Sequence, residues 1–244
     1  MREQGCLYAV GAGPGNPEWM TLEADRILRQ APVIAFPKGQ RDRPGRAETI
    51  IKRYLTPHKR VLTLVFPMVG DSQMLNAAWD EAALEVAACL SSGQDVAFVT
   101  EGDPAIYSTF YYLQDALERI IPDLHTEIVP GVSSVFAASA HLQSPLVLGT
   151  ESLAVVPASQ NMEAVARALE HFDTVVILKV ARVFDRLLAI LAERNLLDRA
   201  VYVANIGRDD VTTVEDVASL AGRSLPYMSL VIVHASKYPR RCGS

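Results

Sequence analysis

Cysteine is scarce in this sequence of 244 residues, which contains only three. Cys6, Cys89 and Cys242 lie far apart and form no CxxC pair, so neither a zinc site nor a disulfide framework is expected. Long apolar runs are also missing, because none approaches the roughly 18 residues of a membrane span. No secretory signal precedes the first expected strand. We therefore expect a protein of the reducing cytoplasm with no membrane partner.

Positive charge is in slight deficit, since 23 Lys and Arg stand against 28 Asp and Glu and the net charge is −5. A field that gathers nucleic acid is therefore not expected. One stretch, residues 37–46, is an exception, because it holds a single acid and four basic residues: Lys38, Arg41, Arg43 and Arg46. Half of the residues are hydrophobic, at 50%, which is enough to bury one large core or two modest ones.

Motifs for side-chain catalysis are absent. The sequence holds no GxSxG, no HExxH and no paired carboxylates, and its five histidines occur alone. A hydrolase or a metalloenzyme is therefore poorly supported, and we assign neither a catalytic side chain nor a metal ligand.

Gly11 to Gly15 form a glycine-rich turn that does not match the dinucleotide fingerprint. Its spacing is GxGxG with Pro14 inside, and the next helix is expected only at Thr21, which is predicted to cap it. This start is too late for a pyrophosphate on the first turn of the helix. The following strand ends in Pro37-Lys38, where a ribose-binding acid would be expected, and no GKS or GKT occurs. A nucleotide-dependent dehydrogenase is therefore disfavoured.

Apolar strands and helices alternate along the chain, which predicts an α/β fold with a mainly parallel sheet. Beyond Pro145 the strands are short and the pattern changes, so we expect two α/β domains, residues 1–122 and 123–244. The first is expected to contain strands 7–10, 33–36, 61–66 and 96–100 with helices 21–30, 47–55, 74–91 and 104–121. Later come strands 126–129, 153–156, 174–179, 200–204 and 227–234 with helices 132–142, 162–171 and 182–194.

Residues 95–113 combine a buried strand, a tight turn and a helix. Asp103 is predicted to cap the helix, Pro104 to occupy its first position, and Gly102 to leave space for another molecule at the backbone. A well-capped strand–turn–helix that binds no ligand explains this local pattern equally well.

Three turns that are poor in large side chains follow strands: residues 11–15, 101–104 and 130–134. In a parallel sheet such turns gather at the edge formed by the carboxyl ends of the strands, where open α/β sheets bind ligands. We expect a small polar molecule bound mainly by backbone groups, and a reaction that depends on positioning more than on acid–base side chains.

Three ordered stretches resemble the motifs of the tetrapyrrole (corrin/porphyrin) methylases: Val10-Gly-Ala-Gly-Pro-Gly-Asn-Pro-Glu18, Glu101-Gly-Asp-Pro-Ala-Ile-Tyr-Ser108 and Val129-Pro-Gly-Val-Ser-Ser134. The resemblance runs from about residue 6 to 235. The stretches 102–110 and Phe66-Pro-Met68 look most like the family group that methylates carbon 20 of precorrin-2, in its metal-free or its cobalt form. Within the family, uroporphyrinogen-III methylases, later corrin methylases and diphthine synthases are the alternatives; outside it, the alternative is a binding protein that has lost turnover.

The resemblance implies two α/β domains with S-adenosylmethionine in the cleft between them, S-adenosylhomocysteine as product, and usually a homodimer. It implies cofactor contacts in the first domain and its junction at Pro14, Glu101, Gly102, Asp103, Ile106, Tyr107, Ser133 and Ser134. It also implies contacts in the second domain, matched by strand order, at Lys179, Gly207 and Ser229. Lys179 departs from the more usual apolar residue, which leaves a backbone contact there.

The tetrapyrrole substrate that the resemblance implies carries eight carboxylates. Basic groups are therefore expected near it, and Lys38, Arg41, Arg43 and Arg46 are the candidate anion-binding residues. A solvated loop is the alternative reading of this stretch.

Overall fold

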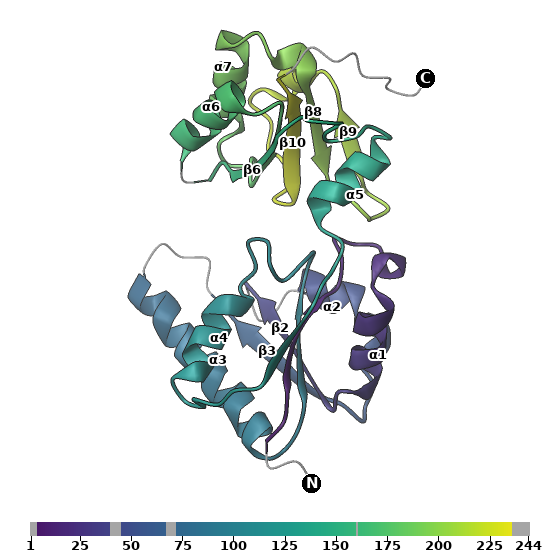
Figure 1. Cartoon of the computed structure of the whole chain (residues 1–244), viewed down its shortest axis with the longest axis vertical. Helices are drawn as coiled ribbons and strands as arrows, with labels where there is room; N and C mark the ends of the chain where they lie inside the picture. The colour runs from purple at the N-terminus through teal and green to yellow at the C-terminus, as the bar shows by residue number, and fades with distance from the viewer. Residues whose placement is uncertain (1–3, 40–44, 67–71, 160, 236–244) are drawn as a thin grey trace. The chain divides into compact units, whose positions relative to one another are not determined.

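The amino-terminal sheet consists of five parallel strands. The computed structural model describes residues 4–39, 45–66, 72–159 and 161–235 (Figure 1). The strands lie in the order β3-β2-β4-β1-β5, and each neighbouring pair is parallel. They are β1 (Leu7–Gly11), β2 (Val33–Lys38), β3 (Arg60–Val65), β4 (Val96–Thr100) and β5 (Thr126–Val129). The predicted parallel sheet is confirmed.

Helices cover both faces of this sheet. The helices are α1 (Leu22–Gln30), α2 (Arg46–Ile50), α3 (Ser72–Ser91) and α4 (Phe110–Glu118), with short 3₁₀ turns η1 (Pro17–Trp19) and η2 (Lys52–Tyr54). Leu7, Ala9 and Phe98 pack with α3 and α4, whereas Val10 and Val99 pack with α1 and α2 (Figure 1). Burial on both faces explains why the strands are nearly continuous apolar runs.

The helix that was predicted from residue 104 begins later. α4 starts at Phe110, and Ser108 accepts a hydrogen bond from the Phe110 N–H at 3.1 Å, so Pro104 does not occupy a first helical position. Tyr107 has a positive φ of 51°, which interrupts a helical path. The prediction was wrong here, because local capping signals do not show that the segment is held by another part of the chain. In contrast, the predicted cap at Thr21 is confirmed, since its Oγ1 accepts from Ala24 N at 3.2 Å.

The second sheet is mixed, with strand order β6-β7-β10-β8-β9. Its strands are β6 (Leu153–Pro157), β7 (Thr174–Leu178), β8 (Ala200–Ala204), β9 (Thr212–Val214) and β10 (Ser229–His234). Only β6 and β7 pair in parallel; β10 runs antiparallel to both β7 and β8, and β9 antiparallel to β8. The accompanying elements are α5 (Ser134–His141), α6 (Met162–His171), α7 (Phe184–Glu193), η3 (Leu197–Arg199) and η4 (Val217–Leu220). β9 was not expected from the sequence.

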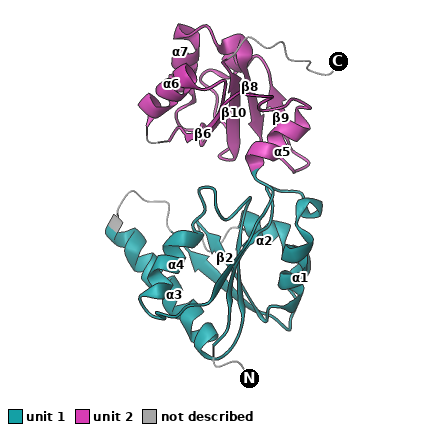
Figure 2. Ribbon diagram, viewed as in Figure 1, with its two compact units in different colours: residues 1–133 teal, residues 134–244 magenta. Residues whose placement is uncertain are grey.

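The chain divides into two compact units, residues 1–133 and 134–244 (Figure 2). This division lies later than the expected boundary after residue 122. The reason is that β5 pairs in parallel with β1 and completes the first sheet. Among the described residues, no helix is both long enough and apolar enough to cross a membrane.

Candidate functional site

The turns after β1 and β4 are joined backbone to backbone in the first unit. Gly13 and Gly102 form an isolated antiparallel bridge, with Gly102 N donating to Gly13 O at 2.8 Å and Gly13 N to Gly102 O at 3.2 Å. Ala12 N also donates to Thr100 O at 2.9 Å. The expectation that these turns gather at the carboxyl edge of the sheet is therefore confirmed.

The turn after β5 joins the same edge through a contact that only glycine allows. A Cβ placed on Gly131 would lie 2.2 Å from the Gly102 carbonyl oxygen and 2.8 Å from Gly11 Cα. A Cβ on Gly11 would lie 2.6 Å from Gly131 N. These distances are far shorter than a real Cβ contact, so the three turns pack as bare backbone.

Asp103 fastens the second turn to the third. Its Oδ2 accepts a hydrogen bond from Gly131 N at 2.9 Å, and its Oδ1 accepts from Ala105 N at 2.8 Å. A carboxylate that accepts two backbone hydrogen bonds holds its neighbours more firmly than a neutral group would. Asp103 therefore does not cap a helix as predicted. It links the loop after β4 to the loop after β5 by hydrogen bonds.

One side of this assembly is open. Gly102 has φ +72°, and a Cβ added there would meet nothing within 4 Å. Ile106 and Tyr107 follow, with 36% and 49% of their surface exposed. Bare backbone beside exposed apolar side chains suits a ligand with both polar and apolar parts.

The remaining predicted residues of the first motifs lie around this edge. Pro14 is buried next to the Gly13 bridge, and Ser133 is 5% exposed. Ser134 is the first residue of α5, so the serine pair spans the division between the two units. Glu101 is partly buried, and its Oε1 lies 4.0 Å from Arg46 Nη1.

Two of the four candidate anion-binding residues are described, and both have acidic neighbours. Lys38 Nζ lies 2.8 Å from Glu48 Oε2, and Gly45 N donates to the same oxygen at 2.9 Å. Burial alone would raise the pKa of Glu48, but these hydrogen bonds outweigh it and hold that pKa below its ordinary value. Arg46 lies near Glu101, as noted above, whereas Arg41 and Arg43 lie outside the described residues.

Two residues that sequence reasoning missed hold the loop after β4. Thr100 is 5% exposed and its Oγ1 accepts from Ser108 Oγ at 3.2 Å. Ser108 in turn accepts from the first N–H of α4. The signal available in the sequence was a serine two residues before the aromatic start of a helix, because a serine hydroxyl often accepts from the backbone N–H two residues on.

In the second unit, the three residues predicted from strand order lie along one edge of its sheet. Lys179 follows β7 with φ 58°, and Gly207 follows β8 with φ 80°. Ser229 begins β10 and pairs with Ala204 at the end of β8. Because β10 runs antiparallel to β7 and β8, its amino end shares an edge with their carboxyl ends. Asn205 N donates to Met228 O at 2.9 Å and links the loops that precede Gly207 and Ser229.

The fold is that of one family. The chain belongs to the tetrapyrrole (corrin/porphyrin) methylases, whose family model matches residues 6–221.

The chain is similar to particular members along most of its length. A cobalt-precorrin-2 C(20)-methyltransferase of Salmonella typhimurium is 34% identical over 233 residues, which cover 94% of this chain and 96% of that protein. A precorrin-2 C(20)-methyltransferase of Sinorhizobium sp. is 33% identical, covering 94% and 95%.

Solved structures give the same fold at lower identity. A cobalt precorrin-4 methyltransferase superposes with a TM-score of 0.72 at 21% identity and covers 93% of each chain. The uroporphyrin-III C-methyltransferase of Thermus thermophilus, complexed with S-adenosylhomocysteine, has a TM-score of 0.67 at 21% identity and covers 95% of this chain and 98% of that one.

Proposed function

We propose that this chain is an S-adenosylmethionine-dependent methyltransferase that methylates carbon 20 of precorrin-2 or of its cobalt complex. The observation that carries this proposal is the 34% identity to a cobalt-precorrin-2 C(20)-methyltransferase over nearly the whole of both chains. The precorrin-2 C(20)-methyltransferase of Sinorhizobium sp., whose name gives the substrate without cobalt, is almost equally similar, at 33%, so both substrate forms stay in the proposal.

The cofactor residues are proposed from the geometry of each unit. In the first, Gly102 leaves its backbone open where a Cβ would lie, and Asp103 holds the neighbouring backbone in place. Such a surface fits the polar groups of the methionine and ribose parts of the cofactor, with Ile106 and Tyr107 beside them. The proposed cofactor residues of the first unit, together with the serine pair where the chain passes into the second, are Pro14, Glu101, Gly102, Asp103, Ile106, Tyr107, Ser133 and Ser134. In the second unit we propose contacts at Lys179, Gly207 and Ser229.

Positioning is the main contribution that these residues make to the reaction. The bound cofactor supplies an electrophilic methyl group on a sulfonium sulfur, for transfer to an electron-rich tetrapyrrole carbon. Holding two reactants close and aligned can supply about 7–11 kcal/mol of barrier reduction. The backbones at Gly11 and Gly131 approach too closely for a Cβ, and this close packing suits the task because it holds the turns against one another. No side chain is assigned as the base that accepts the displaced proton.

We propose that Lys38, Arg41, Arg43 and Arg46 bind carboxylates of the substrate. Among the described residues, Arg46 gives the most direct support. It begins α2, and its Nη1 lies 4.0 Å from Oε1 of Glu101, a proposed cofactor residue in the loop after β4. Lys38 already forms an ion pair with Glu48. To bind a substrate carboxylate, its ammonium group must contact both Glu48 and the substrate.

Single-turnover mass spectrometry tests the proposed reaction. The purified protein is mixed with S-adenosylmethionine and either precorrin-2 or its cobalt complex. We expect a gain of one methyl group, and its appearance on only one form assigns the natural substrate. No methyl transfer to either form, with cofactor binding intact by calorimetry, contradicts the proposal and points to another tetrapyrrole or to diphthine synthesis.

A glycine variant tests the cofactor site separately. Gly102→Ala adds a methyl group to the open side of the loop, and Gly222→Ala is its matched control in the second unit, with φ +68° and nothing within 4 Å. Both changes strain a left-handed backbone. Only Gly102→Ala is expected to weaken cofactor binding, by about tenfold, the equivalent of one lost polar contact. Equal calorimetric affinities for the two variants would place the cofactor elsewhere.

We also propose that the protein is a homodimer of the cytoplasm. Light scattering coupled to size-exclusion chromatography tests the dimer, and a monomer at micromolar concentration contradicts it.

A further inference from the structure

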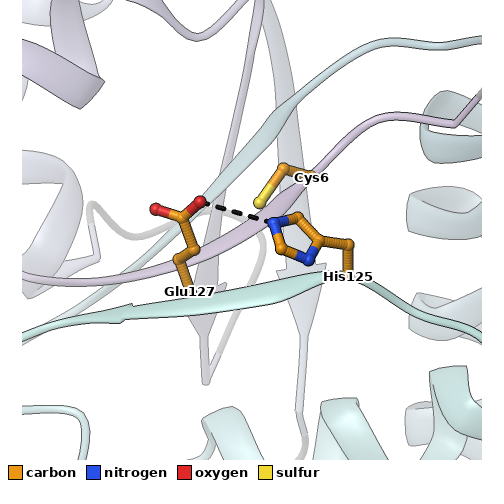
Figure 3. A group of neighbouring side chains, drawn as sticks. All are labelled: Cys6, His125 and Glu127. Atoms are coloured by element: carbon orange, nitrogen blue, oxygen red, sulfur yellow. Dashed lines mark ion pairs between the residues drawn. The ribbon is translucent and has the colours of Figure 1, made fainter. Parts of the chain in front are cut away.

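A second group of reactive side chains lies at the opposite ends of the same strands. Cys6 precedes β1, while His125 and Glu127 lie at the start of β5, at the amino edge of the first sheet. One sulfur, one imidazole nitrogen and one carboxylate oxygen from these residues all lie within 4.8 Å of one another. Figure 3 shows the three side chains pointing toward a common point.

Strand pairing brings these residues together across more than a hundred residues of sequence. β1 and β5 are parallel with Leu7 opposite Thr126, and Leu7 N donates to His125 O at 2.9 Å. Cys6 is therefore level with His125, and Tyr8 is level with Glu127. Because side chains alternate along a strand, all four lie on the same face of the sheet.

The cysteine is fixed, whereas the other two side chains can adjust. Cys6 is 1% exposed, and its N–H donates to Asp95 Oδ1 at 2.8 Å. The preceding Gly5 fits so tightly that a Cβ there would lie 2.0 Å from Gln94 O. The His125 and Glu127 side chains are 65% and 48% exposed, with Nε2 and Oε1 3.4 Å apart. Solvent therefore reaches the group from one side.

Tyr8 lies beside this group and has Cys6, Asp95 and Glu127 as ionisable neighbours. Burial, followed by Cys6, Asp95 and Glu127, raises the pKa of Tyr8 to about 12. The phenol therefore stays protonated at neutral pH.

We propose that Cys6, His125 and Glu127 bind one Zn²⁺ ion. Thiolate, imidazole and carboxylate are all zinc ligands, and the soft thiolate disfavours Mg²⁺ and Ca²⁺. Zn–S and Zn–N bonds of about 2.0–2.3 Å place neighbouring ligand atoms about 3.3–3.8 Å apart, so the group must close by about 1 Å at its widest. The exposed His125 and Glu127 side chains can supply this movement. Water completes a fourth position.

This site would join the edge strand β5 to β1 and is independent of methyl transfer. Asp95 has the role of a positioning residue, because it orients the backbone of Cys6 without offering that oxygen to the metal. No metal site was expected from the sequence, because the cysteines form no CxxC pair and no HExxH motif occurs.

Titration of the untagged, metal-free full chain with Zn²⁺ and with Co²⁺ tests the proposal. We expect one equivalent of each to bind, with release of the Cys6 thiol proton to the buffer. The Co²⁺ form should show near-ultraviolet thiolate-to-metal absorption that Zn²⁺ removes. The melting temperature of the protein should rise with Zn²⁺, because a ligand that binds only the folded state stabilises it.

Variants locate the binding. Glu127→Gln and His125→Ala change exposed side chains and should leave the fold intact, yet each should weaken Zn²⁺ affinity by about 10–100-fold or more. Cys6→Ser should remove the thiolate band, whereas Cys89→Ser and Cys242→Ser should keep it. Absence of saturable one-to-one binding, or a thiolate band that survives Cys6→Ser, overturns the proposal. Unchanged Zn²⁺ affinity in both Glu127→Gln and His125→Ala overturns it as well.

Discussion

Each unit places its candidate cofactor residues at one edge of its sheet, but the two sheets arrange their strands differently. The first sheet is entirely parallel, so every strand delivers its carboxyl end to one edge, where residues 11–15, 101–104 and 130–133 meet. The second sheet reverses β10, so the amino end of one strand joins the carboxyl ends of two others around Lys179, Gly207 and Ser229.

The two sheet edges also differ in the residue types that form their loops. In the first unit, glycine backbones touch directly and Asp103 clamps them. In the second unit, Lys179 and Asn205 adopt positive φ values of 58° and 54° although they carry side chains. In the first unit the turns therefore approach too closely for a side chain at Gly11 and Gly131, whereas at the second edge residues with side chains adopt left-handed conformations.

The largest expected effect comes from Gly131→Ala. Its Cβ would lie 2.2 Å from Gly102 O, so the backbone must shift, and we expect a loss of about 3–5 kcal/mol of unfolding free energy. Gly222→Ala in the second unit, where the space is open, should cost only about 1 kcal/mol. Urea unfolding of both variants measures this contrast. Similar losses would mean that the first edge is not crowded as described.

The next effect concerns substrate binding. Replacing Arg41 and Arg43 with alanine should raise KM for the tetrapyrrole by about tenfold or more, because charge-assisted hydrogen bonds to carboxylates are lost. The matched control is the double replacement of Arg186 and Arg223, exposed arginines of the second unit, which should leave KM unchanged. An unaltered KM in the first variant would remove residues 37–46 from the substrate site.

A third comparison uses one carboxylate clamp from each unit. Asp103 holds Gly131 N and Ala105 N, whereas Asp173 holds the N–H and Oγ of Ser152 at 2.8 Å each. Asp103→Ala and Asp173→Ala should both lower the melting temperature. Only Asp103→Ala should also weaken cofactor binding, by about tenfold. Calorimetry with S-adenosylmethionine decides this, and equal affinities in the two variants contradict the assignment of Asp103.

The smallest effect is a dependence of stability on pH in the acid range. Hydrogen bonds from Arg29 and then Tyr54 lower the pKa of Asp25 from 3.8 to about 2. The Ser152 backbone N–H, followed by its hydroxyl, lowers the pKa of Asp173. A lowered pKa in the folded state contributes stability above the ordinary value near 3.8 and loses it as the pH falls toward the folded value.

Asp25→Asn and Asp173→Asn should therefore lower the melting temperature at pH 7, and for Asp25→Asn the gap from the parent should close between about pH 4 and pH 2. Thermal unfolding followed by circular dichroism across this range measures it. A gap that stays constant with pH would mean that ionisation of the carboxylate contributes nothing.

Sequence reasoning succeeded where the signal was local and periodic. The strands of the first sheet, the cap at Thr21 and the gathering of three glycine-bearing turns were all predicted and are confirmed. It failed where a distant partner decides the outcome. The role of Asp103 depends on Gly131, which a helix-capping argument does not include. The end of the first unit depends on the pairing of β5 with β1.

The sequence by itself determined the α/β class, the parallel first sheet and the family, because apolar periodicity and ordered glycine motifs are properties of short stretches of chain. Only the tertiary structure decided which turns touch, that Gly11 and Gly131 admit no side chain, and that Cys6 meets His125 and Glu127. The physical reason is that parallel pairing joins strands that are far apart in sequence. The registers that set these contacts are fixed by burial of whole sheet faces, which no short motif encodes.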